Sequence, residues 1–131
     1  CVLEHIPDWA STLREVHRVL KPGGKLTMSV DSLATLESAE AVERHRKAYD
    51  VVRYFRPDEI SGVLEKLGFR DVRVRPLLRS RLAARWFGVG IGNDFHYRYL
   101  EAVLRYVALV VNEWWRGRGG DGVYLLVSGR K

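Results

Sequence analysis

Apolar residues recur every three or four positions between residues 9 and 20, and this spacing predicts an amphipathic helix. Its buried stripe comprises Trp9, Leu13, Val16, His17 and Leu20. Asp8 precedes the stripe and is a suitable N-cap, because its carboxylate can accept hydrogen bonds from the free amides of the first turn. The run Lys21-Pro22-Gly23-Gly24 ends the helix. Leu26–Val30 follows as a short strand, whose apolar character suits a central position in a parallel sheet.

The next segments continue the alternation of helix and strand. Residues 32–54 have a mostly helical pattern and many charges, which fits either a lid over a site or a solvated helix. Arg56-Pro57-Asp58-Glu59 opens another helix, with proline in the first turn and acids at the positive end of the helix dipole. Valines alternate with arginines from residue 72 onward, which predicts a strand with one wet face at or near the edge of a sheet.

Residues 79–121 are less regular than the rest of the chain. The pattern predicts a helix from Arg79 to Phe87, a flexible break at Gly88–Gly92 and a long helix from about Asp94 to Arg116. Gly117–Gly122 is then predicted as a loop.

A last predicted strand, Val123–Ser128, completes an order in which strands alternate with helices, and this order predicts an α/β fold with a layered sheet. The length of 131 residues and the hydrophobic content of 47% are those of one globular domain. The net charge of +6 comes mostly from scattered arginines, which argues against a nucleic-acid partner. The positive charge then indicates either a solvated surface or a face that binds an acidic substrate or a lipid surface. The single cysteine excludes an internal disulfide, so a cytoplasmic location is the default. No apolar run approaches the ~20 residues of a membrane span.

Two motifs near the beginning of the chain form a specific pair. Val2–Asp8 reads VLEHIPD and Arg18–Gly24 reads RVLKPGG. At this spacing the pair resembles the small-molecule branch of the class I S-adenosylmethionine-dependent methyltransferases. Asp50–Phe55, followed by Gly68-Phe69, also resembles a segment of that family. The resemblance covers residues 1–78 well and extends less closely to the last strand.

The resemblance implies a seven-stranded Rossmann-like sheet in the order 3-2-1-4-5-7-6, with strand 7 antiparallel. Strands 5, 6 and 7 would be Leu26–Val30, Asp71–Arg75 and Val123–Ser128. The chain would then be the C-terminal part of the domain, with an incomplete sheet and its flanking helices at residues 1–78 and 122–131, and a helical insert at 79–121. The glycine-rich turn and the acid that hold the cofactor in this family belong to the half that the chain lacks. We therefore expect that the chain does not bind S-adenosylmethionine alone.

The resemblance also implies where the site lies. Glu4 and His5 follow the carboxyl end of a strand, where ligands of open α/β sheets bind. These are the candidate catalytic residues, and Glu4 is expected to orient or polarise the methyl acceptor. The alternative for both is that they brace the following helix. Cys1, Val2 and Leu3 are expected to border the methionine and sulfonium end of the cofactor, mainly through backbone and apolar contacts.

Three further residues lie in or beside the predicted lid. His45, Arg53 and Tyr54 are candidates for binding the acceptor, with a purely structural role as the alternative. Methyl transfer requires that the acceptor be placed in line with the methyl carbon, and it requires a general base only where the acceptor is protonated at the working pH. No two histidines are spaced to face each other on one helix with an acid between them, so no metal site is predicted.

The sequence therefore predicts methyl transfer from S-adenosylmethionine to a small-molecule acceptor, by a protein of which this chain is one part. The aromatic residues of 79–121 have several possible roles. They could pack on the sheet or lid, bind an apolar or lipid-like acceptor, form a subunit interface, or make a weak contact with a membrane surface. The expected partners are the acceptor and either the missing N-terminal half or a second copy of the chain. The alternative function is a non-catalytic assembly module that pairs through the open edge of its sheet.

Overall fold

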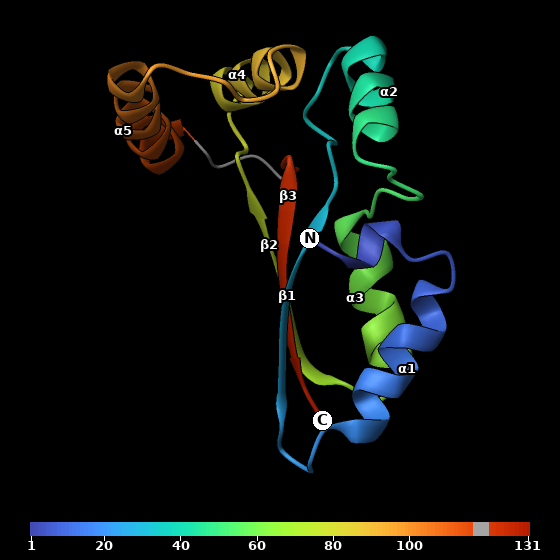
Figure 1. The fold of residues 1–131 in the computed structure, drawn as a ribbon. Coiled ribbons are helices and arrows are strands. Elements are labelled where there is room, and N and C mark those ends of the chain that lie inside the picture. Colours follow the sequence, from blue (N-terminus) through green and yellow to red (C-terminus); the bar gives the residue numbers. More distant parts are fainter. Residues whose placement is uncertain (117–120) are drawn as a thin grey trace.

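A three-stranded sheet forms the centre of the molecule. The computed structural model describes residues 1–116 and 121–131, and Figure 1 shows how their elements are arranged. The strands are β1 (Lys25–Asp31), β2 (Arg70–Leu77) and β3 (Tyr124–Arg130), in the order β1-β3-β2. Because β3 pairs antiparallel with both neighbours, β1 and β2 run parallel to each other. The sequence predicted these three strands and their order, while their numbering within a larger sheet stays a prediction.

Helices cover one face of the sheet and one end of its strands. In chain order they are the 3-10 helix η1 (Leu3–His5), α1 (Trp9–Val19), α2 (Ala39–Ala48), α3 (Pro57–Lys66), α4 (Arg81–Gly92) and α5 (Tyr99–Arg116). α1 and α3 lie on one face, whereas α2, α4 and α5 lie beyond the end at which β1 finishes (Figure 1).

The connection from α1 to β1 explains the first motif pair in physical terms. Asp8 caps α1, since its Oδ1 accepts a hydrogen bond of 3.2 Å from the backbone N–H of Ser11. At the other end, Gly23 has a φ of +76°, and a Cβ on Gly24 would lie 2.8 Å from the carbonyl oxygen of Lys21. Glycine is thus required at both positions of this turn, which sends the chain directly into β1.

Two apolar clusters hold the elements together. The first joins α1 and α3 to the sheet and contains Leu3, Leu13, Val30, Phe55, Ile60, Leu64, Phe69, Leu125 and Val127. The second lies at the far end of the strands and contains Leu33, Ala84, Phe87, Ile91 and Val123. The candidate site described below lies between the η1 end of the first cluster and the α2–α4 layer of the second.

The predicted flexible break at Gly88–Gly92 is wrong, because α4 continues through all three glycines to Gly92. Tertiary packing outweighs the low helix propensity of glycine here. Phe87 and Ile91 are buried in the second cluster, and Gly90 lies so close to the ring of Phe95 that a Cβ would collide with it. The glycines therefore allow close packing rather than interrupting the helix.

The central position of β1 in a larger parallel sheet stays a prediction, and the open edge expected in the absence of a further strand is present in the described part of the chain. There β1 is an outer strand, and the neighbour with which it pairs is the antiparallel β3. Leu26, Met28 and Val30 alternate with more polar residues and pack on the α1–α3 side. The strand is thus apolar on one face only, and its second edge has no paired strand among the described residues.

Two helix boundaries differ from the predicted ones. Of residues 32–54, only Ala39–Ala48 form a helix, and before it the backbone N–H groups of Ser32 and Leu33 both donate to the carbonyl of Val123. α5 begins at Tyr99 rather than near residue 94, because Asp94 and Phe95 have φ values of +52° and +56°. Most of the predicted loop at Gly117–Gly122 lies outside the described residues.

Candidate active site

A cavity of about 530 Å³ lies at the carboxyl end of β1. Its walls come from η1, β1, α2, β3 and the connection between α4 and α5. The lining residues are Cys1, Glu4, His5, Asp31, His45, Tyr49, Phe95 and Tyr124. The fold thus brings the beginning, middle and end of the chain together where α/β sheets place their ligands.

Backbone hydrogen bonds fix the walls of this cavity relative to one another. The carbonyl oxygen of Glu4 accepts hydrogen bonds from the N–H groups of Val52 and Arg53, at 2.9 and 3.2 Å. The N–H of Phe55 donates to the carbonyl of Asp31 at 2.9 Å. The segment after α2 is therefore attached both to η1 and to the end of β1, which holds the two acidic residues in place.

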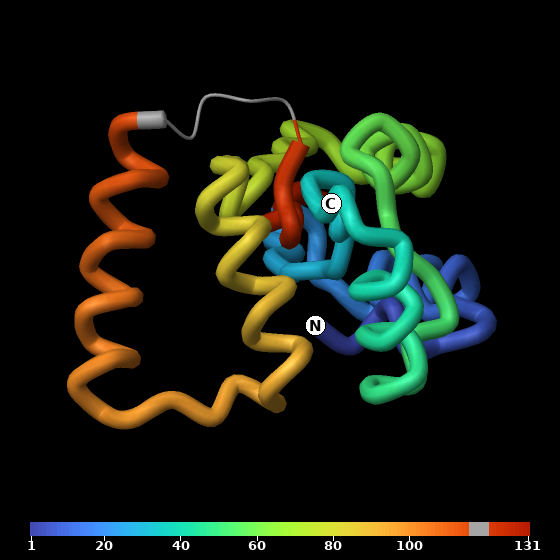
Figure 2. Tube along the Cα trace, turned by 90° about the horizontal axis from the view of Figure 1, so that it is seen from above, coloured from blue at the N-terminus to red at the C-terminus, as the bar shows by residue number. Residues whose placement is uncertain are grey.

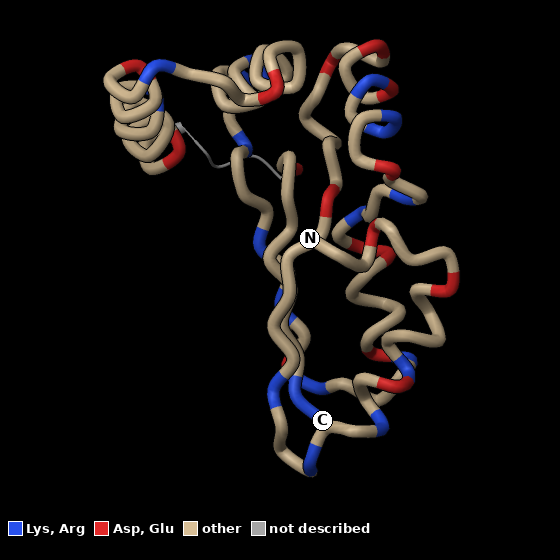
Figure 3. The backbone as a smooth tube through the Cα atoms, in the orientation of Figure 1, with Lys and Arg blue, Asp and Glu red and all other residues tan. Residues whose placement is uncertain are grey.

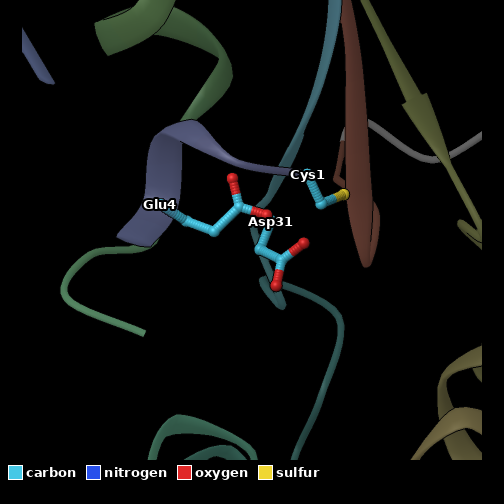
Figure 4. Close-up of side chains that lie close together, drawn as sticks. All are labelled: Cys1, Glu4 and Asp31. Atoms are coloured by element: carbon cyan, nitrogen blue, oxygen red, sulfur yellow. The ribbon is translucent and has the colours of Figure 1, made fainter. Parts of the chain in front are cut away.

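Glu4 and Asp31 form a buried pair of carboxyl groups (Figure 4). Glu4 is 0% exposed and Asp31 is 4% exposed. Among the described residues, neither carboxylate oxygen of Glu4 has a hydrogen-bond partner, and neither does Oδ1 of Asp31. Burial, reinforced by the negative charge of Glu4, raises the pKa of Asp31 to about 7. Such a pair holds a proton near neutral pH and is free to accept hydrogen bonds from a ligand.

Cys1 completes a group of three side chains that could hold a metal ion. The thiol of Cys1 and the carboxylates of Glu4 and Asp31 have ligand atoms that all lie within 4.8 Å of one another (Figure 4). The sequence predicted no metal site, because no two histidines are spaced to face each other on one helix with an acid between them. The structure supplies a different set of donor atoms, one thiol and two carboxylates.

His45 lines the cavity beside Asp31, and Tyr54 supports His45 from outside the cavity. His45 Nδ1 lies 3.1 Å from Tyr54 Oη, which itself donates to the carbonyl of Val42 at 3.3 Å. Since the single hydroxyl proton is used there, Nδ1–H of His45 is the donor to Tyr54. Burial lowers the pKa of His45 by more than the negative charge of Glu4 raises it, and this favours the neutral ring.

The tautomer of His45 follows from these bonds. A neutral ring that is protonated on Nδ1 leaves an unprotonated Nε2, which lies 3.8 Å from Oδ2 of Asp31. Burial also raises the pKa of Tyr54 to about 12, so its hydroxyl remains protonated. The arrangement can therefore accept a proton at Nε2 of His45 while Tyr54 keeps the ring oriented.

The structure separates the predicted site residues into two groups. Cys1, Glu4, His5 and His45 line the cavity, and Tyr54 supports it through His45. His5 is exposed, and its Nδ1 lies 3.4 Å from the carbonyl of Asp50.

Three predicted site residues lie elsewhere. Leu3 is buried in the first apolar cluster, so only its backbone remains for a cofactor, and the side chain of Val2 points to solvent. Arg53 pairs with Glu59, and its guanidinium lies 4.9 Å from the centre of the Trp9 ring. It is not among the residues that line the cavity. The roles assigned to these residues remain predictions.

Four residues line the cavity although the sequence did not predict them: Asp31, Tyr49, Phe95 and Tyr124. A signal was available for Asp31, because an acid directly after a buried strand lies at the carboxyl end of the sheet. The three aromatic residues carry no comparable signal, since their positions depend on how α2, α4 and β3 pack together.

Comparisons with known proteins place the chain in a family. A family model described as a methyltransferase domain matches residues 1–74. The ubiquinone biosynthesis O-methyltransferase of Ralstonia nicotianae is 30% identical over 112 residues, which cover 79% of this chain and 46% of that protein. The protein of the same name from Pseudomonas aeruginosa is 32% identical over 107 residues, covering 76% and 45%. The chain thus spans less than half the length of these relatives.

Solved structures show the same fold. An S-adenosylmethionine-dependent methyltransferase from Mesorhizobium loti gives a TM-score of 0.58 at 19% identity, covering 99% of this chain and 58% of that one. Phosphoethanolamine N-methyltransferase 2 of Haemonchus contortus, in complex with S-adenosyl-L-methionine, gives 0.60 at 18% identity, covering 100% and 31%. These likenesses confirm the α/β methyltransferase fold, and S-adenosylmethionine is confirmed as the cofactor of the family. By the match over residues 1–74, the chain belongs to the methyltransferase domain family.

Proposed function

We propose that this chain forms the acceptor side of an S-adenosylmethionine-dependent methyltransferase that modifies a small molecule. The observation that carries the proposal is the buried carboxylate of Glu4, which has no partner among the described residues and lies beside Asp31 in the cavity. A volume of about 530 Å³ is within the ordinary range for small-molecule sites. Family membership supports methyl transfer as the reaction.

The residues present fit one part of the cofactor. S-adenosylmethionine carries its positive charge on the sulfur that bears the methyl group, and two buried carboxyl groups suit a cation at this position. Cys1 and the backbone of Leu3 lie at the same end of β1. When bound, the cofactor supplies an electrophilic methyl group. We propose that the glycine-rich turn and the ribose-binding acid that hold the cofactor come from residues outside this chain.

The side chains around the cavity would then have distinct roles. Glu4 accepts a hydrogen bond from the acceptor and orients its reacting atom. Nε2 of His45 accepts the proton that an acceptor hydroxyl loses, and Tyr54 keeps the imidazole in the required tautomer. A hydroxyl acceptor is supported by the ubiquinone biosynthesis O-methyltransferases among the relatives. His5 lies at the exposed mouth, where it can contact the outer part of the acceptor.

The substitution Glu4→Gln tests this proposal, because it preserves the shape of the side chain and removes its charge. We expect the rate of methyl transfer by the natural protein to fall by about 100-fold, while the protein stays folded. The measurement is transfer of a labelled methyl group from S-adenosylmethionine to the acceptor. Glu15→Gln is the matched control, since Glu15 is exposed on α1 and pairs with Arg18. A Glu4→Gln protein with the parent rate would contradict the role of Glu4.

A second candidate function rests on the outer edge of β1. No strand pairs with that edge within the described residues, and open strand edges recruit further strands. We propose, as the second candidate, that the chain serves as a non-catalytic module that assembles through residues 25–31. The buried acids of the cavity favour the catalytic candidate, because an assembly module has no need of them.

A further inference from the structure

Helix α5 turns its apolar residues away from the protein. Ten of them are between 41% and 86% exposed. They are Tyr99, Leu100, Val103, Leu104, Tyr106, Val107, Val110, Val111, Trp114 and Trp115. At about 100° per residue these positions occupy about half of the helix circumference, and no charged residue of the helix falls in that half. In a helix that packs on a water-soluble core the apolar half faces inward, so α5 has the opposite orientation.

Glu101, Arg105 and Glu113 lie on the other half of α5, where each of them is paired. The Glu113 carboxylate accepts hydrogen bonds from the backbone N–H and Nε of Arg79, at 2.8 and 3.2 Å. Arg105 pairs with Glu101 at 2.8 Å, and its guanidinium lies 5.2 Å from the centre of the Trp86 ring on α4. The polar half therefore attaches α5 to the rest of the protein, and the apolar half is left uncovered in the described structure.

The position of α5 makes this half accessible. Figure 2 shows α5 running beside α4 at the periphery of the tube, on the side away from the sheet. Along α5 the backbone in Figure 3 carries few coloured positions, in contrast to the densely charged α2. A groove of about 510 Å³ between α4 and α5 extends the apolar surface to Leu82, next to Leu104, Val107 and Val111.

The distribution of aromatic and basic residues indicates what covers this surface. Tyr99 lies at one end of α5 and Trp114-Trp115 at the other, and such amphipathic rings favour the boundary between water and lipid. Residues 79–116 contain six arginines and three acids, and Glu101 and Glu113 are already paired. Arg98 is exposed and lines a groove together with Leu100 and Leu104 of the apolar surface. This excess of positive charge complements anionic headgroups, whereas a second copy would bring like charges together.

We propose that α5 is a membrane-surface helix that binds anionic lipid bilayers. Its 18 residues span about 27 Å and lie in the plane of the interface, with the apolar half among the acyl chains. Arg98 contacts the headgroups at the edge of the buried surface. No described helix is long and apolar enough to cross a membrane. The proposal does not depend on the reaction that the protein catalyses.

Vesicle flotation of the natural protein tests the proposal. We expect the parent to float with vesicles of phosphatidylcholine and phosphatidylglycerol, and to float much less with phosphatidylcholine alone. The double substitution Val107→Glu and Val111→Glu should lower binding at least tenfold. Its matched control is Val19→Glu with Val52→Glu, which charges two exposed valines outside α5 and should bind like the parent. Arg98→Gln should weaken binding to the anionic vesicles about fivefold.

Other occupants of the surface give different results. If a second copy covers α5, light scattering will show a dimer that Val107→Glu converts to a monomer, without vesicle binding, and the proposal fails. If another part of the natural protein covers α5, the parent will not float and Val107→Glu will destabilise it, which also overturns the proposal. Methyl transfer to a water-soluble acceptor should be unchanged in the Val107→Glu, Val111→Glu protein. A failure of the membrane proposal is therefore distinguishable from a failure of the proposed reaction.

Discussion

At the scale of single residues, the most informative feature is the contrast between Glu4 and Arg53. Both were predicted from the sequence as site residues. The carboxylate of Glu4 is buried at the end of β1 and lacks a partner in the described structure. The guanidinium of Arg53, in contrast, forms an ion pair with Glu59 and lies over the ring of Trp9. A buried polar group without a partner is unfavourable for folding, and this is why we propose Glu4, and not Arg53, as the residue that contacts the acceptor.

The titration of Asp31 gives a prediction for stability. Its pKa is raised from 3.8 to about 7 in the folded state, so between these values the folded state binds more protons than the unfolded state. The free energy of unfolding should therefore decrease as the pH rises from ~4 to ~7, by on the order of 4 kcal/mol. Urea unfolding of the protein at several pH values measures this slope.

Asp31→Asn is the comparison that isolates this effect. His45, whose pKa is lowered by burial, contributes with the opposite sign, because there the unfolded state binds the extra proton as the pH falls. The asparagine protein should lose the Asp31 contribution and be more stable than the parent above pH 7. An unchanged slope would show that Asp31 does not carry the proton.

Sequence reasoning reached some of these residues and not others. The motif that contains Glu4 and His5 placed them near a ligand, and charge pattern placed His45 and Tyr54 near the lid. Asp31 belongs to the same cavity because β1 ends beside η1, and that adjacency is a property of the fold. Likewise, the partners of Arg53 are known only once α1 and α3 are packed side by side.

At the scale of elements, α4 shows where local propensity fails. Three glycines in five residues predicted a break, yet the segment is helical because Phe87 and Ile91 are buried and Gly90 packs against Phe95. By contrast, the start of α1 and the turn at Gly23-Gly24 were predictable, since capping and positive φ are local requirements. The second half of the chain depends more on tertiary contacts, and its boundaries were predicted less well.

Two alanine substitutions test the continuity of α4. A Cβ on Gly88 meets no atom within 4 Å, so Gly88→Ala should raise the free energy of unfolding by about 0.5–1 kcal/mol through helix propensity. Gly90→Ala places a Cβ against the Phe95 ring and should lower the free energy of unfolding by about 1 kcal/mol. Urea denaturation compares both with the parent. If Gly88→Ala instead destabilised the protein, residues 88–92 would not be a regular helix in solution.

At the scale of the whole molecule, the sheet and its order were predictable, whereas the placement of α5 was not. The alternation of helices and strands predicted an α/β sheet, and the family resemblance of the motif pair implied the order β1-β3-β2. The periodicity of α5 predicted a helix with an apolar stripe but not the direction of that stripe. Only the contacts of Glu113 and Arg105 show that it faces outward.

The central claim is that the chain belongs to an enzyme that methylates a small molecule. The most direct measurement incubates the natural protein with methyl-labelled S-adenosylmethionine and a cell extract, then separates small molecules from protein and nucleic acid. We predict label in the small-molecule fraction, and its loss in the Glu4→Gln protein. Label that is confined to protein or nucleic acid would contradict the claim. The absence of any methyl transfer by a folded protein would also contradict it, and would favour the assembly module.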